Sequence, residues 1–211
     1  MVKLYCIPGL GADYRVFEQI TCAEKIVLDW VEPKKRESLD DYALRLRDQI
    51  DTKQEYYLLG LSLGGMLAQR MLLYLDVPPK KLFLISTLKD IKELPPLYRL
   101  GLHKIIPFQY LRPPLWLAKI FFGTRSKNEG RILKAILVDT DLIFLGWATN
   151  ALFKFKPVQT EIPTVRIHGD KDVLIPYTKD PSTVTIKNSG HFMVLTHGRK
   201  VNKIILEAIN D

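Results

Sequence analysis

The chain has 211 residues, of which 47% are hydrophobic and 26% are charged, and its formal net charge is +8 with a pI near 9.4. These values are ordinary for a globular protein, and the length favours one domain with an insertion. No apolar run is long enough to form a membrane-spanning helix, so we expect no stable membrane insertion.

The basic residues are spread along the chain. The tightest group, residues 34–36, is followed at once by Glu37 and by two aspartates at 40–41. No RNA-binding aromatic motif or zinc-finger spacing accompanies it. Solvated faces are therefore the favoured interpretation, with attraction for phosphate-bearing substrates as an alternative. We expect a small-molecule substrate and no nucleic-acid partner.

The N-terminal stretch and the cysteines favour a cytoplasmic location. The first apolar run is too short for a signal peptide and lacks a small-residue cleavage site. Cys6 and Cys22 form neither a disulfide framework nor a C-x-x-C pair. Cys6 falls within a predicted strand and is expected to be a buried thiol.

The first 87 residues alternate between predicted strands and helices. Asp13 and Ser38 are predicted N-caps, the second in a capping box that has aspartate in place of glutamate. This alternation argues for a parallel sheet covered on both faces, with right-handed crossovers. Strands are expected at 2–7, 25–29, 56–60 and 82–86, and helices at 13–20, 38–50 and 63–76.

Between residues 88 and 157 the alternation gives way to a helical insertion. Helices are predicted at 97–106, 115–122 and 139–155, and a further helix is predicted to begin at a capping box at Ser126. They are apolar on more than one face, which favours a cap over a pocket rather than ordinary packing against the sheet. We expect a core of residues 1–87 and 158–211, with residues 88–157 as the cap or lid.

Strands at 163–168 and 182–186 and a helix at 199–209 complete the predicted elements. The fold class is therefore α/β, a three-layer αβα sandwich around a mostly parallel six-stranded sheet.

A G-x-S-x-G pattern at residues 60–64 lies between a predicted strand and a predicted helix. Such a turn brings main chain against main chain, so Gly60 and Gly64 have to be small. Ser62 would then stand at a helix N-terminus, where unpaired N–H groups face any anion that forms. This context favours a nucleophile over a glycine-rich loop.

A serine nucleophile needs a base, and the base needs an acid that holds its tautomer. In open parallel sheets such residues gather at the carboxyl ends of the strands. Ser62, Asp172 and His191 follow the third, fifth and sixth predicted strands. Alternatives for the acid are Asp170 and Asp90.

The other histidines have different expected places. His197 competes with His191 but lies past the loop, where a helix start or the surface is favoured. His168 ends a strand and is expected to be buried and hydrogen-bonded, while a surface position is expected for His103. No cluster has metal-ligand spacing, so we expect no metal and no cofactor.

Taken together, these motifs resemble the α/β-hydrolase fold family over essentially the whole chain. Residues 60–64 match the nucleophile elbow, H-G-D-K-D at 168–172 matches the acid loop, and S-G-H at 189–191 matches the histidine loop, in the order Ser, Asp, His. The resemblance implies that Ser62 is the nucleophile, His191 the general acid and base, and Asp172 the orienting carboxylate. It favours Asp172 over Asp170, and it implies an oxyanion hole formed by the backbone N–H groups of Leu10 and Leu63.

The sequence departs from the family pattern at two places. Pro8 stands where the family often has a histidine before the first-strand glycine. The chain also begins at the strand that carries this loop, so the family's first two antiparallel edge strands are missing. We therefore expect a six-stranded sheet that is entirely parallel.

The resemblance implies a serine hydrolase that cleaves an ester or thioester of a small, hydrophobic acyl substrate through an acyl-enzyme. The alternatives are other chemistries of the fold (acyltransferase, C–C hydrolase, lyase or peroxidase) and a non-catalytic ligand-binding member. Cap residues that would shape an apolar pocket are Phe108, Trp116, Phe121, Phe144 and Trp147. The sequence leaves the oligomeric state open.

Overall fold

The computed structural model describes residues 2–94, 96 and 114–211. One sheet runs through the molecule with strand order β2-β1-β3-β4-β5-β6, and every neighbouring pair is parallel. The prediction of a six-stranded, all-parallel sheet is confirmed. The strands are β1 (Lys3–Ile7), β2 (Glu24–Val27), β3 (Tyr56–Leu61), β4 (Leu82–Ile85), β5 (Thr164–Gly169) and β6 (Thr183–Ile186).

Both faces of the central strands are buried, which explains why β1, β3 and β4 are almost continuously apolar. Successive side chains of a strand point to opposite faces. In β1, Tyr5 and Ile7 join one core cluster, whereas Leu4 and Cys6 join the other. Cys6 is fully buried, as expected, and burial raises the pKa of its thiol far above the ordinary value.

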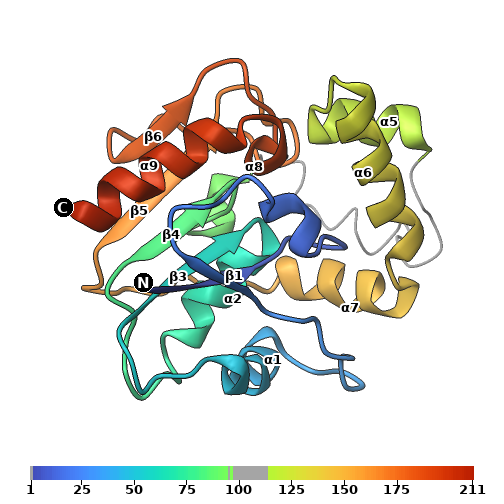
Figure 1. Ribbon diagram of the computed structural model, residues 1–211. Coiled ribbons are helices and arrows are strands. Elements are labelled where there is room, and N and C mark those ends of the chain that lie inside the picture. The colour runs from blue at the N-terminus through green and yellow to red at the C-terminus, as the bar shows by residue number, and fades with distance from the viewer. Residues whose placement is uncertain (1, 95, 97–113) are drawn as a thin grey trace.

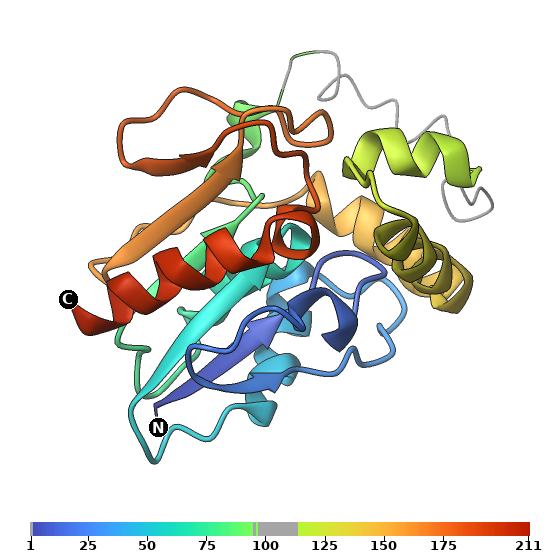
Figure 2. The same ribbon diagram turned by 45° about the horizontal axis from the view of Figure 1, so that its top comes forward.

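Helices cover the two faces and form the outer layers of the sandwich (Figures 1 and 2). The first face packs against α1 (Leu39–Leu46), which continues as η2 (Arg47–Gln49), and against α2 (Leu63–Met71). The second face packs against η1 (Tyr14–Phe17), α8 (Met193–Thr196) and α9 (Gly198–Asn210).

Two predicted helices are shorter than expected. Asp13 caps η1 by accepting the Arg15 N–H, as predicted, but only a short 3-10 turn follows, in which Val16 and Phe17 are buried. The helix after Ser62 ends at Met71, and the next residues form turns. Ser38 caps α1 by accepting the Asp41 N–H, as predicted.

The segment between β4 and β5 contains η3 (Ile91–Glu93), α5 (Leu115–Phe122), α6 (Lys127–Asp139) and α7 (Leu142–Leu152). The predicted capping box at Ser126 is present, with Glu129 as its second member. Gly123 ends α5 in the left-handed conformation, with φ of 71°. These helices lie beyond the carboxyl ends of the strands (Figure 2). The helix predicted at 97–106 lies outside the described residues.

No helix within the described ranges combines the length and the apolar character that crossing a membrane requires.

Candidate active site

Ser62 occupies a strained turn between β3 and α2. Its φ of 53° and ψ of −119° are unusual for a residue other than glycine. Two hydrogen bonds hold this conformation: the Ser62 N–H donates to the Ile85 carbonyl at 2.9 Å, and the Thr87 hydroxyl donates to the Ser62 carbonyl at 2.6 Å. The turn therefore presents a half-buried hydroxyl at the start of α2.

The flanking glycines are required by close main-chain contacts, as the sequence pattern predicts. A Cβ added at Gly60 would lie 2.4 Å from the Gly65 Cα, and one added at Gly64 would lie 2.2 Å from the Ile7 carbonyl oxygen. Both neighbours are backbone atoms, which cannot move aside without distorting β1 or α2.

Gly64→Ala is therefore expected to destabilise the fold by about 3 kcal/mol or more, because the overlap is with backbone. Urea unfolding followed by circular dichroism measures the change. Gly130→Ala in α6 is a matched control, since the added methyl group meets only the flexible end of Lys119. The control should be neutral or stabilising by up to about 1 kcal/mol. Equal stability of the two variants would contradict this account.

Three predicted site residues, from loops far apart in sequence, lie within hydrogen-bonding distance of one another. His191 Nε2 is 2.9 Å from Ser62 Oγ, and His191 Nδ1 is 2.8 Å from Asp172 Oδ2. His191 and Asp172 are 4% and 5% exposed. The loops after β3, β5 and β6 thus bring together a hydroxyl, an imidazole and a carboxylate, with the imidazole in the middle.

The carboxylate of Asp172 is fixed by several donors. Its Oδ1 accepts the backbone N–H groups of Leu174 and Ile175 at 3.0 and 2.9 Å. Its Oδ2 faces two rings, His191 at 2.8 Å and His168 at 3.3 Å. Burial opposes ionisation, but the charge that His191 acquires on protonation and these hydrogen bonds hold the pKa of Asp172 well below its usual range. The carboxylate is therefore ionised at neutral pH.

An ionised Asp172 determines the tautomer of each neighbouring ring, because a carboxylate only accepts. His191 carries its hydrogen on Nδ1, which leaves the lone pair of Nε2 directed at the Ser62 hydroxyl. His168 carries its hydrogen on Nε2, because that atom faces only acceptors, the Ile175 carbonyl at 2.9 Å and Asp172. His168 is buried and hydrogen-bonded, as predicted.

The alternative residues lie in other environments. The Asp170 side chain is exposed and accepts the Ser189 N–H at 3.3 Å. Asp90 caps η3, and His197 lies at the start of α9 with its ring hydrogen-bonded to Thr196. Burial lowers the pKa of His197. His103 lies outside the described residues.

The loop after β1 packs directly against the serine turn. A Cβ added at Gly9 would lie 3.2 Å from the Ser62 Cβ, which places Leu10 beside the site although Pro8 replaces the family's histidine. Leu63 is the first residue of α2, so its N–H has no acceptor within the helix. Within the described part of the chain, no hydrogen bond uses the N–H of Leu10 or Leu63.

The aromatic residues predicted to shape a pocket have varied environments. Phe144 is buried against Trp30, with ring centroids 4.8 Å apart, and Trp147 packs on Tyr42 at 4.2 Å. Trp116 is 64% exposed. Phe121 is half-buried, and Phe108 lies outside the described residues. Their role in a substrate pocket stays a prediction.

Sequence reasoning missed Phe122, the aromatic residue next to the candidate site. Its ring meets His191 edge-on at 6.0 Å, and its carbonyl accepts the Phe192 N–H at 3.1 Å. No signal in the sequence separates Phe121 from Phe122, because the rotation of α5 decides which ring faces the histidine loop.

Residues 4–204 match the model of the Alpha/beta hydrolase family, which is nearly the whole chain. The chain belongs to this family. A search of curated proteins gives no match. The match to the family model confirms the predicted family. The parallel six-stranded sheet with helices on both faces confirms the predicted fold class of this alpha/beta hydrolase.

Three solved structures illustrate the similarity of this alpha/beta hydrolase to its relatives. A thermophilic esterase from Thermogutta terrifontis with malate bound is 17% identical, with a TM-score of 0.76 and coverage of 100% of this chain and 90% of that one. An esterase from Exiguobacterium antarcticum is 16% identical, with a TM-score of 0.74 and coverage of 100% and 92%. A bromoperoxidase from Bacillus anthracis is 18% identical, with a TM-score of 0.71 and the same coverage. At these identities the likeness shows the fold alone.

Proposed function

We propose that this protein is a serine hydrolase that cleaves an ester or thioester of a small, hydrophobic acyl group through an acyl-enzyme. The observation that carries the proposal is the continuous hydrogen-bonded series from Ser62 through His191 to Asp172, with distances of 2.9 and 2.8 Å. The tautomer that Asp172 imposes leaves a basic nitrogen against a hydroxyl, which is the arrangement a serine nucleophile needs.

In the first half of the reaction, Ser62 Oγ attacks the acyl carbon while its proton passes to His191 Nε2. The carbonyl oxygen becomes an oxyanion that the N–H groups of Leu10 and Leu63 stabilise, each contributing about 3 kcal/mol. The tetrahedral intermediate collapses, the bond to the leaving oxygen or sulfur breaks, and His191 returns the proton to that atom. The product is an acyl ester on Ser62.

In the second half, water replaces the leaving group. His191 Nε2 takes a proton from the water as its oxygen attacks the acyl carbon, and the same two N–H groups stabilise the oxyanion. Collapse breaks the bond to Ser62 Oγ, which regains its proton from His191. Asp172 stabilises the imidazolium in both halves and stays ionised.

Residues 88–157 act in this proposal as a cap on a core of residues 1–87 and 158–211. Two contacts support this position of the cap over the core: Arg15 pairs with Asp139 at 2.7 Å, and the Phe122 ring lies against His191. An apolar ring beside the imidazole suits a hydrophobic acyl group better than a charged one.

A panel of p-nitrophenyl esters and acyl thioesters of graded chain length tests the function. We expect turnover that rises with acyl length until the pocket is filled, and covalent labelling of Ser62 by a fluorophosphonate probe, located by mass spectrometry. Absence of both turnover and labelling would reject the proposal and favour a member of the fold that binds ligands without hydrolysing them.

A further inference from the structure

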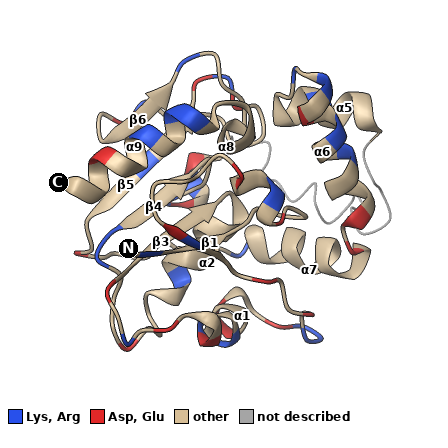
Figure 3. Ribbon diagram, in the orientation of Figure 1, with Lys and Arg blue, Asp and Glu red and all other residues tan. Residues whose placement is uncertain are grey.

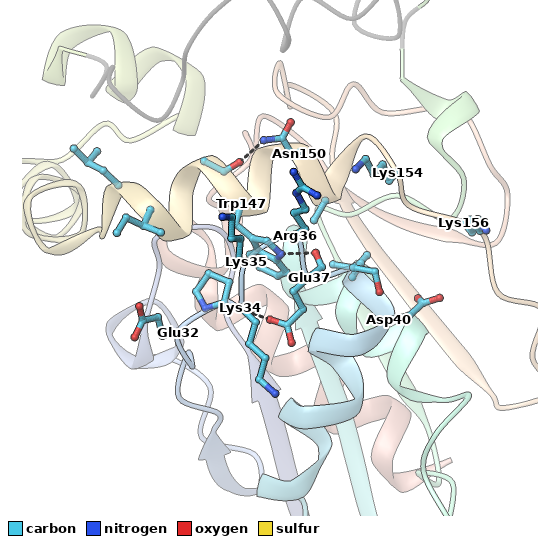
Figure 4. A pocket seen from close by; sticks show the side chains of 17 residues that line it. Glu32, Lys34, Lys35, Arg36, Glu37, Asp40, Trp147, Asn150, Lys154 and Lys156 are labelled. Atoms are coloured by element: carbon cyan, nitrogen blue, oxygen red, sulfur yellow. Dashed lines mark hydrogen bonds between the residues drawn. The ribbon is translucent and has the colours of Figure 1, made fainter.

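A concave site lies away from the candidate triad. It is a groove of about 1210 Å³ between residues 32–40, in the loop that leads into α1, and one side of α7 with the chain that follows it (Figure 4). Ser62, Asp172 and His191 are not among its lining residues. The groove is open to solvent along part of its length, so a ligand can enter without movement of the helices.

The acidic side chains of the groove are largely engaged in ion pairs. Glu37 binds Arg45 through two hydrogen bonds of 2.7 and 2.8 Å. Asp40 likewise accepts two hydrogen bonds from the Arg70 guanidinium, and the bond from Nη2 to Oδ2 measures 2.7 Å. Glu32 is the remaining carboxylate. Most of the negative charge is therefore neutralised by arginines that do not line the groove.

Within the described ranges, the basic side chains of the groove form no such doubly hydrogen-bonded ion pair. Among the described residues, no ion pair joins them to a carboxylate, and residues 97–113 contain no Asp or Glu that could supply one. Figure 3 shows the basic stretch at the tip of the loop before α1. The five lining cations are Lys34, Lys35, Arg36, Lys154 and Lys156.

One wall of the groove is apolar. Leu142 and Ile143 of α7 line it, and Ile143 is 68% exposed. Trp147 lines it as well, and its indole N–H donates to the Glu37 carbonyl at 2.9 Å, which fixes the ring against the loop. An excess of cations beside an apolar wall suits a ligand with a charged end and an apolar or aromatic body.

We propose that this groove binds a phosphoryl-bearing ligand whose apolar part lies against α7. A phosphoryl group carries up to two negative charges and three acceptor oxygens, so it can bind more than one of the lining cations. A single carboxylate carries only one negative charge and therefore binds the lining cations of the groove less strongly. The inference does not depend on the chemistry proposed for Ser62, since the two sites share no residue.

Arg36 allows a variant that separates binding from stability. Its backbone is in the left-handed region, with φ of 59°, where glycine is the favoured residue. Arg36→Gly therefore removes a charge from the groove without adding backbone strain. Combined with Lys35→Gln and Lys154→Gln, it removes three of the five lining cations.

Calorimetric titration at low ionic strength tests the proposal with pyrophosphate and with 1-naphthyl phosphate. We expect both to bind the native protein, and the triple variant to bind each roughly tenfold more weakly or worse. Affinity should also fall as salt is added. Ser62→Ala should bind both probes unchanged, so failure of the hydrolase proposal leaves this test intact.

A control variant carries the same loss of charge on other surfaces. Lys127→Gln, Lys187→Gln and Lys200→Gln change exposed residues outside the groove and should leave binding within twofold of the native protein. Equal weakening in the two triple variants would overturn the proposal, because it would show only the effect of net charge. Absence of binding to both phosphates and to the vesicles described next would also overturn it.

Two further measurements identify the ligand's body and its source. Ile143→Ser should weaken binding of 1-naphthyl phosphate and not of pyrophosphate, and equal effects on the two would reject the apolar wall. Flotation with phosphatidylcholine vesicles, with and without phosphatidic acid, tests a lipid headgroup. Binding that needs phosphatidic acid and the groove cations assigns the phosphoryl group to a lipid, and binding to the free phosphates alone assigns it to a small molecule.

Discussion

Replacing Ser62 with alanine is expected to lower kcat by up to roughly a millionfold on the best ester of the panel. In the proposed mechanism the variant lacks the oxygen that forms the acyl-enzyme, so His191 would have no proton to take and the reaction would lose its covalent route. The fold should survive, because the Ser62 side chain is half-buried and caps nothing in α2. Steady-state kinetics, with circular dichroism to verify folding, measure the effect.

Ser86→Ala is the matched control. Ser86 also directly follows a strand and has a positive φ, 46°, and it is fully buried, but its hydroxyl has no hydrogen-bond partner within the described structure. Removing an unsatisfied hydroxyl should leave kcat unchanged and stability equal or slightly higher. A Ser62→Ala protein that keeps turnover close to the native value would remove the nucleophile from the mechanism.

The features that the sequence predicts best are those with local causes. Gly60 is required by a contact with Gly65, within the same turn, so this part of the G-x-S-x-G pattern has a local cause, whereas Gly64 is required by a contact with Ile7 of β1. The capping box at Ser126 and the end of the helix predicted at 115–122, where Gly123 follows, likewise depend on neighbours in the chain. The parallel sheet follows from the alternation of elements, since only crossovers can join parallel strands.

The convergence of Ser62, Asp172 and His191 rests on a different argument. Their meeting follows from the rule that parallel strands end at one edge of the sheet, and the choice of Asp172 over Asp170 came from family resemblance. The structure places the Asp172 carboxylate against the imidazole and leaves Asp170 exposed. Sequence periodicity alone does not separate two aspartates that are two residues apart in a loop.

Features that depend on the packing of segments far apart in the sequence could not be predicted from the sequence. The basic group at residues 34–36 looked like a solvated face, and only the packing of α7 beside it makes a groove. The rotation of α5 turns Phe122 toward His191, and helical periodicity in a segment that is apolar all round does not fix that rotation.

Asp172→Asn is expected to lower kcat about ten-thousandfold while leaving the backbone in place. The two N–H groups of Leu174 and Ile175 donate to one oxygen of the side chain, so the amide oxygen of the asparagine must stay there. The NH₂ group then occupies the position that faces His191 Nδ1, and it can only donate. His191 is forced into the tautomer with hydrogen on Nε2, which cannot take the proton of Ser62.

The matched control for Asp172→Asn is Asp170→Asn, two residues earlier in the same loop. The exposed Asp170 uses one oxygen to accept the Ser189 N–H, and an amide oxygen can do the same, so kcat should change by less than about threefold. Nitrogen-15 NMR of the His191 ring reads the tautomer directly. A loss of turnover in Asp172→Asn without the tautomer change would assign Asp172 a structural role only, whereas both changes together require that the carboxylate acts through the imidazole.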